Sequence, residues 1–358
     1  MKRIAHIFLT SIICSLLCFA CDDIESTDGS SSEYKSLLIN QYDNVIIPSM
    51  IAYQSTLSDL KIATSTFVNT TNNGNFSNLK AAYDSAYFAY QRAVVNNYKS
   101  SENLEQISNI FKIDTNKANS YITNRNYNFN DVFSQKDANG FPIMDFMIFK
   151  PSDPISYFNA DPKRKDFLDT LAKSMSANMD NILANWSTLR GEFTSSGGTN
   201  IGSSISTQLN RSLIYYEKMI REEKVGIPIG KKKPGDSFAA DTTEIEAYYR
   251  SVNDGNEAFT LALLKQAIMG IENIYLGRSL TGNNEQGYDD ILNSLGKSGI
   301  NTDIKQQFTD IYTEINSRTS ISGDEELYNK VQGIITLFKT DLLTALNVQD
   351  TDSANDGD

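Results

Sequence analysis

The stretch that decides the fold is DPKRKDFLDTLAKSMSANMDNILANWSTLRGEF, residues 161–193. Its apolar side chains recur every three or four residues, which is the period of an α-helix. These side chains are Phe167, Leu171, Met175, Met179, Ile182, Trp186 and Leu189. Asp161 and Pro162 open the stretch as a helix N-cap and a first-turn proline. The sequence therefore predicts a long amphipathic helix with one buried face.

The same helical spacing recurs over most of the chain, and no run alternates as a strand would. Further apolar stripes cover residues 79–98, 205–220, 304–315 and 327–342. The helix predicted from about residue 256 to 275 is apolar on most sides, so we expect it at the centre of the fold. Gly270 within it would permit a close helix crossing. The predicted fold class is all-α.

The best domain boundary is the Ser-Ser-Gly-Gly-Thr run at residues 195–199, a composition typical of a loop. About four helices lie on each side of it, which is the content of a four-helix bundle. We therefore predict two tandem four-helix-bundle-like domains, at residues 34–194 and 200–347, and an internal duplication.

The first residues read as an export signal. Lys2 and Arg3 precede an apolar run that ends at Ala20-Cys21, and this run is shorter than a membrane-spanning helix. A small residue before a cysteine resembles a lipobox, so residues 1–20 are the predicted signal and Cys21 the predicted lipidation site. An ordinary secretory signal cut after Ala20 is the alternative. The prediction places the protein in a Gram-negative cell envelope, anchored to the outer membrane, with the face left open.

Both ends of the mature chain are acidic and poor in apolar residues. Residues 21–33 are predicted to form a flexible tether, and residues 348–358 a disordered tail. The whole chain carries a net charge of −12. A protein of this charge is repelled by phosphate backbones, so nucleic acid is not expected as a partner.

The residue counts exclude several kinds of chemistry. The single histidine is His6, and the three cysteines are Cys14, Cys18 and Cys21. Removal of the predicted signal leaves no histidine and one cysteine. The mature chain could then form no Ser-His-Asp triad, no Cys-His dyad, no histidine-based zinc site and no intramolecular disulfide.

Three segments interrupt the helical pattern. In the first, residues 140–149, Asp145 is the only acid in an apolar run. It either stabilises a helix start or faces a cleft between helices. The second, Lys224 to Gly230, ends a helix and leads into a run of three lysines at 231–233. That run is either a solvated loop or a place to bind an anion.

The third segment is residues 246–251, Glu-Ala-Tyr-Tyr-Arg-Ser. Glu246 and Arg250 are four residues apart, so they could pair on one helix face. With Tyr249 and Ser251 they suit either a polar pocket or a buried structural network.

Taken in order, these segments resemble those of the imelysin-like proteins, also called iron-regulated-protein-A-like. The segment around Pro48 and the helix that runs on to Gly277 add to the resemblance, which covers roughly residues 35–345. It implies an all-helical fold of two four-helix bundles in exported or lipid-anchored envelope proteins, often associated with iron or haem acquisition. The founding member was described as an insulin-cleaving protease.

The family's proposed metal or catalytic motif is Gly-x-His-x-x-Glu. In this sequence it aligns with Gly140 to Asp145, and Pro142 stands in the histidine's place. Proline has no side-chain donor atom for a metal. The departure argues against carrying peptidase activity over to this chain.

Three functions follow as hypotheses. The first is a non-catalytic envelope lipoprotein that binds a small ligand or metal complex between the bundles, linked to iron or haem uptake. Its candidate site residues are Gly140, Pro142, Asp145, Glu246, Tyr249, Arg250 and Ser251. Direct binding of iron or calcium would need oxygen ligands such as Asp145 and Tyr249. The alternatives are a metal-assisted peptidase and an adaptor that docks other envelope proteins.

Overall fold

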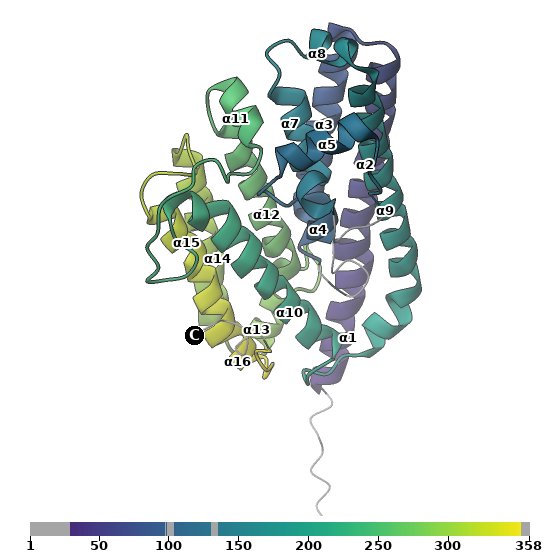
Figure 1. Ribbon diagram of the computed structural model, residues 1–358. Helices are drawn as coiled ribbons and strands as arrows, with labels where there is room; N and C mark the ends of the chain where they lie inside the picture. Colours follow the sequence, from purple (N-terminus) through teal and green to yellow (C-terminus); the bar gives the residue numbers. More distant parts are fainter. Residues whose placement is uncertain (1–28, 97, 99–103, 130–134, 352–358) are drawn as a thin grey trace, which may run out of the picture.

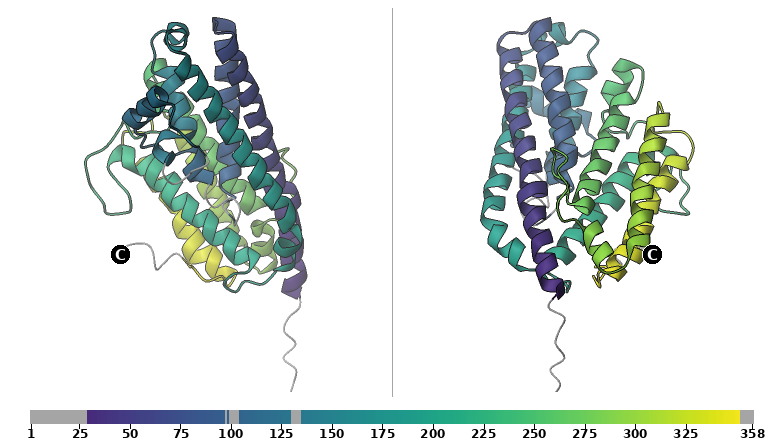
Figure 2. Two further views of the ribbon diagram at one scale, coloured as in Figure 1. Left: turned by 45° about the vertical axis from the view of Figure 1, so that its right-hand side comes forward. Right: turned by 180° about the vertical axis from the view of Figure 1, so that it is seen from behind.

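The computed structural model describes residues 29–96, 98, 104–129 and 135–351. Over these residues the chain is helical, with no β-strand beyond an isolated bridge between Arg278 and Asn284. The helices form two bundles that lie side by side (Figure 1), and the view from behind shows the same arrangement (Figure 2). The predicted all-α fold is confirmed.

The first bundle is built around the long helices α2, α3 and α9, because α2 packs against both of the others. Its elements are α1 (Gly29–Asn40), η1 (Gln41–Ile46), α2 (Ile47–Asn69), α3 (Asn73–Val94), α4 (Leu104–Ser108), α5 (Thr115–Asn124), η3 (Lys136–Ala138), α7 (Gly140–Phe149), α8 (Pro154–Ala160) and α9 (Pro162–Ser195). Asp161 begins α9 as predicted, since its side chain accepts a hydrogen bond from the Lys163 N–H at 2.9 Å.

The second bundle is built around α12, α14 and α15. Its elements are α10 (Ser204–Tyr215), η4 (Tyr216–Gly226), η5 (Ile227–Ile229), α11 (Tyr248–Asp254), α12 (Ala258–Leu276), α13 (Tyr288–Ser294), α14 (Ser298–Ser317), α15 (Glu326–Thr336), η6 (Leu337–Leu342) and α16 (Leu343–Ala345).

Helix α12 is central, as its apolar surface predicts. It packs against α3 of the first bundle and against α14 and η4 of the second. Gly270 permits the crossing with α3, because a Cβ there would lie 2.9 Å from a methyl carbon of Val95. The buried apolar side chains of both bundles form one continuous cluster across this contact.

A π-helix precedes a proline in each bundle. η1 leads into Pro48 of α2, and η4 leads into Pro228 of η5. The wider π-helical turn occurs mostly as a local departure from the α-helix, frequently at functional sites. This parallel agrees with the expected internal duplication, which stays a prediction, as does the boundary at residues 195–199.

The predicted ends of the chain need two corrections. Helix α1 begins at Gly29, inside the stretch predicted as a tether. At the other end, Val348 is buried, and the Asn210 amide bonds the backbone of Gln349 and Thr351 at 3.0 and 2.9 Å. These bonds order the first residues of the predicted tail.

The predicted signal, Cys21 and the end of the tail lie outside the described residues. Within the described part of the chain, no helix combines the length and apolar character needed to cross a membrane.

Candidate functional site

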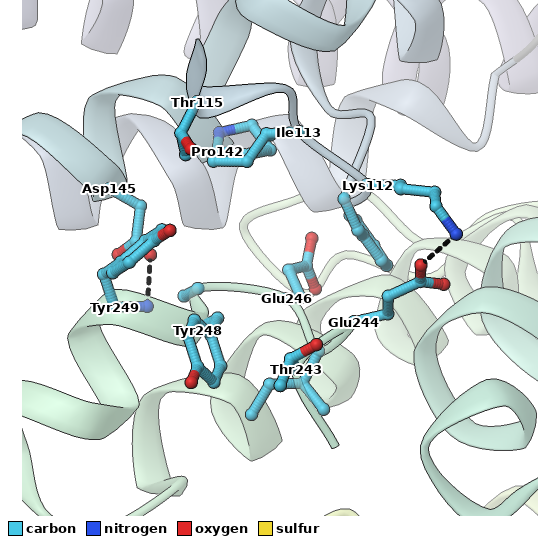
Figure 3. Close-up of a pocket in the computed structure, with 13 residues that line it drawn as sticks. Lys112, Ile113, Thr115, Pro142, Asp145, Thr243, Glu244, Glu246, Tyr248 and Tyr249 are labelled. Atoms are coloured by element: carbon cyan, nitrogen blue, oxygen red, sulfur yellow. Dashed lines mark hydrogen bonds and ion pairs between the residues drawn. The ribbon is translucent and has the colours of Figure 1, made fainter. Parts of the chain in front are cut away.

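A cavity of about 290 Å³ lies where the first bundle meets the segment that leads into α11 (Figure 3). We call it the inter-bundle cavity. Three stretches line it: residues 111–115 before and at the start of α5, one face of α7, and residues 243–249. Its lining residues are Phe111, Lys112, Ile113, Thr115, Pro142, Asp145, Thr243, Glu244, Ile245, Glu246, Ala247, Tyr248 and Tyr249.

The start of α7 sets one wall of the cavity. Gly140 has a φ of +73°, and a Cβ at this position would lie 2.2 Å from the carbonyl oxygen of Ser108. Only glycine therefore fits against α4 in this conformation. The close approach directs Pro142 and Asp145 from α7 toward the cavity.

Asp145 caps a helix, though not the one it belongs to. Its carboxylate accepts hydrogen bonds from the backbone N–H groups of Tyr249 and Arg250, at 2.7 and 3.1 Å (the first is drawn in Figure 3). These groups lie in the first turn of α11, where the helix dipole favours a negative charge. Burial raises the pKa of Asp145 to about 7, against the opposing effect of these two hydrogen bonds. Asp145 thus joins α7 to α11 beside the cavity.

Glu246 is the centre of a buried polar network. One carboxylate oxygen accepts hydrogen bonds from the amides of Gln91 and Asn109, at 2.6 and 2.7 Å. The other oxygen pairs with the Lys224 ammonium, and both side chains are almost completely buried. Burial lowers the pKa of Lys224, while the Glu246 charge opposes that change. The network ties α3, the segment after α4 and η4 together.

The expected pair between Glu246 and Arg250 does not form. Ala247 has a φ of +56° just before α11, so Glu246 does not share a helix with Arg250. Arg250 instead pairs with Asp84 at 2.9 Å and with Asp254. Its guanidinium packs 4.7 Å from the centre of the Phe149 ring.

Ser251 also lies away from the cavity, where its hydroxyl bonds that of Thr260 at 3.0 Å. Of the sequence candidates, Pro142, Asp145, Glu246 and Tyr249 line the cavity together. Gly140, Arg250 and Ser251 instead position the elements around it.

The sequence analysis did not single out Lys112, Thr115, Thr243, Glu244 or Tyr248 as site residues. Lys112 and Glu244 form an ion pair of 2.5 Å at the rim of the cavity (Figure 3). The position of Thr115 could have been predicted from Asp114, because aspartate is a common helix N-cap. Asp114 does cap α5 in the structure. Lys112, Thr243 and Glu244 lie in loops and Tyr248 is the first residue of α11, so no periodicity marks which way these side chains point.

The comparisons with known proteins agree with this architecture. The imelysin family model matches residues 46–347. The chain belongs to the imelysin family. No curated protein matches the sequence.

Two solved structures share the imelysin fold with this chain. An imelysin-like protein from Psychrobacter arcticum 273-4 has a TM-score of 0.69 and 13% identity, over 89% of this chain and 97% of that one. A putative iron-regulated protein A precursor from Parabacteroides distasonis ATCC 8503 has a TM-score of 0.66 and 13% identity, over 88% and 94%. At this identity the likeness concerns the fold.

The residues that the sequence analysis aligns with the family's proposed motif do not fit a metal centre. Pro142 offers no donor atom, and both oxygens of Asp145 already accept backbone hydrogen bonds. In the described part of the chain, no group of three or more His, Cys, Asp or Glu side chains is placed to hold a metal ion. The donor set therefore differs from the three protein ligands typical of catalytic zinc.

Proposed function

We propose that this imelysin-family protein is a binding protein that takes a small, uncharged polar ligand in the inter-bundle cavity. One observation carries the proposal: each acidic side chain that lines the cavity already has a partner within the protein. Glu246 faces Lys224, Glu244 faces Lys112, and Asp145 faces two backbone N–H groups.

The remaining lining groups suit such a ligand. Tyr248 and Tyr249 offer aromatic faces, and Thr115 and Thr243 offer hydroxyl groups. Aromatic surface with a few hydroxyls is the composition of many small-molecule sites. The volume matches the small end of such pockets, about 300 Å³, so the expected ligand has the size of a sugar residue or a capped amino acid.

A nuclear magnetic resonance experiment tests this function. Saturation transfer from the purified protein would be measured to neutral monosaccharides and to N-acetylated amino-acid amides. We expect binding by one of these classes, and its loss in Thr115→Phe, whose ring would fill the cavity. Thr313→Phe, on the exposed face of α14, is the matched control. Transfer that is absent for both classes, or equal in the two variants, would contradict the proposal.

A role connected with iron is a second candidate. It is supported by the P. distasonis relative, which is named as a putative iron-regulated protein A precursor. We expect the abundance of this protein to rise in iron-limited cells. Constant abundance would count against the role. Haem would have to bind outside the inter-bundle cavity, because a porphyrin is larger than this space.

Envelope anchoring at Cys21 remains part of the proposal. Helix α1 begins at the lower end of the molecule in Figure 1, whereas α7 and α11 lie in its upper half. An anchor before α1 would therefore hold the protein by the end away from the cavity. Labelling of cells with a fatty-acid analogue should mark the protein and not its Cys21→Ser variant.

The adaptor that docks other envelope proteins stays an alternative. An exposed, tyrosine-rich surface would favour it. Among the described residues, the exposed large apolar side chains are scattered aliphatics and Phe238, with no tyrosine among them.

A further inference from the structure

A second hollow lies wholly within the second bundle, between η4, the loop after η5, and the helix formed by α15 and η6. Its volume is about 680 Å³, and it shares no lining residue with the inter-bundle cavity. Its basic lining residues are Lys218, Arg221, Lys232, Lys233 and Lys339. We call it the basic groove. Two of its walls, η4 and η6, are π-helical, a geometry frequent at functional sites.

The acidic residues of the groove are fewer than the basic ones. Glu217 pairs with Lys339 at 2.8 Å. Glu222 is shared by two lysines, Lys218 at 3.9 Å and Lys232 at 3.8 Å. Asp236 is the third acid in the lining, and its carboxylate accepts a hydrogen bond from the backbone of Lys233 at 3.1 Å. The groove therefore carries an excess of positive charge.

Arg221 is the least compensated of these charges. Its side chain lines the groove although the residue is only 7% exposed. One terminal nitrogen donates to the amide oxygen of Gln332 at 3.0 Å, and Nε has no hydrogen-bond partner. Within the described residues no carboxylate forms an ion pair with this guanidinium. A buried charge whose hydrogen-bond partner is a neutral amide is unfavourable unless an anion completes it.

We propose that the basic groove binds a phosphate group, carried by a small soluble molecule or by a lipid headgroup. The planar guanidinium of Arg221 would donate two parallel hydrogen bonds to phosphate oxygens, a geometry that lysine cannot supply. Lys232, which is 56% exposed, would add a point charge from the loop. The lysine run at 231–233 then contributes to an anion site built mainly by η4.

Calorimetric titration of the purified protein with inorganic phosphate and pyrophosphate tests the proposal. We expect saturable binding that weakens as salt is added. Arg221→Gln should weaken binding by about tenfold, because a bidentate charged contact is lost. Lys232→Gln should weaken it by about threefold, as for an exposed charge. Lys173→Gln on α9, with a similar exposure of 57%, should leave it unchanged.

Gln332→Glu tests the same idea without removing the arginine. The new carboxylate would form an ion pair with the Arg221 guanidinium in place of the ligand. Phosphate binding should therefore be lost while the helix content stays intact. This variant answers the question even if Arg221→Gln fails to fold.

Flotation with phosphatidylglycerol vesicles distinguishes the two sources of phosphate. Binding of vesicles alone would identify a headgroup, and binding of the soluble anions alone a small molecule. Either result supports the proposal if Gln332→Glu abolishes it. Folded protein that binds none of these probes, or binds them equally in Gln332→Glu, would overturn it.

Discussion

The two hollows of this molecule solve the same electrostatic problem in opposite ways. Lys224, almost fully buried beside the inter-bundle cavity, meets the carboxylate of Glu246. Arg221, only three residues earlier in η4, donates to a neutral amide in the basic groove. A buried cation that is paired with a carboxylate of the protein stabilises the fold, whereas one without such a partner can bind an anionic ligand. The contrast distinguishes a structural charge from a binding charge on one helix.

The largest expected effect comes from breaking the compensated pair. Lys224→Met leaves the Glu246 carboxylate buried without its cation, so the free energy of unfolding should fall by about 3–5 kcal/mol. Urea denaturation measures this loss. The double variant Lys224→Met with Glu246→Gln should recover much of it. A matched change in an exposed pair, Lys173→Met, should cost less than about 1 kcal/mol. Equal losses for the two lysines would remove the distinction.

The next effect concerns the wall of the inter-bundle cavity. Gly140→Ala places a methyl group against the carbonyl oxygen of Ser108 in a conformation with positive φ. We expect a loss of about 2–3 kcal/mol in the free energy of unfolding. Gly191→Ala, a helical position with open space around it, should be neutral or stabilising by up to about 1 kcal/mol. The pair can be compared by thermal unfolding, and a mild Gly140→Ala would mean that α7 can move away from α4.

Asp145 predicts a pH dependence that sharpens the comparison. Its pKa is raised by burial to about 7, so the fold favours the neutral acid. The stability that it contributes should be complete below about pH 4 and lost as the pH rises through about 7. The cost of Asp145→Asn, about 1–2 kcal/mol at low pH, should therefore shrink between pH 4 and 8.

Asp153, the N-cap of α8, is a control with the opposite sign. Hydrogen bonds from the hydroxyl and the backbone N–H of Ser156 lower the pKa of Asp153. The cost of Asp153→Asn should appear above the usual aspartate pKa and vanish as the pH falls. Urea titrations at a series of pH values would reveal both trends, and parallel trends for the two variants would refute the assignment.

The smallest effect is expected from a variant that gives the buried cation of the basic groove a carboxylate partner, as Lys224 has in Glu246. Without any anion present, Gln332→Glu gives Arg221 a carboxylate partner and should stabilise the fold by about 1 kcal/mol. The melting temperature should rise in buffer free of phosphate, and added phosphate should no longer raise it. A variant less stable than the parent protein would show that Arg221 is already satisfied.

Much of the fold follows from periodicity. The stripe that begins at Asp161 gives α9 its start and its buried face, and the all-apolar helix becomes the central α12. The order of the imelysin-like segments is also visible in the sequence. These features are predictable because they depend on local spacing and on burial.

The details of the site were harder to predict because they depend on backbone turns. Glu246 and Arg250 have helical spacing, yet the left-handed conformation of Ala247 separates them and sends Glu246 to Lys224. The sequence leaves Asp145 either at its own helix start or in a cleft, whereas it lines the cavity and caps α11, about a hundred residues away in sequence. Long-range partners of this kind leave no local pattern.

The continuous apolar core described above bears on how the molecule comes apart. Since α12 packs on both α3 and α14, neither bundle can open without exposing surface that belongs to the other. The protein should therefore melt as one cooperative unit. The mostly exposed connection at residues 195–202 offers a place for a protease to nick the chain. The two fragments should then stay associated, so the covalent link between the bundles is dispensable once the core has formed.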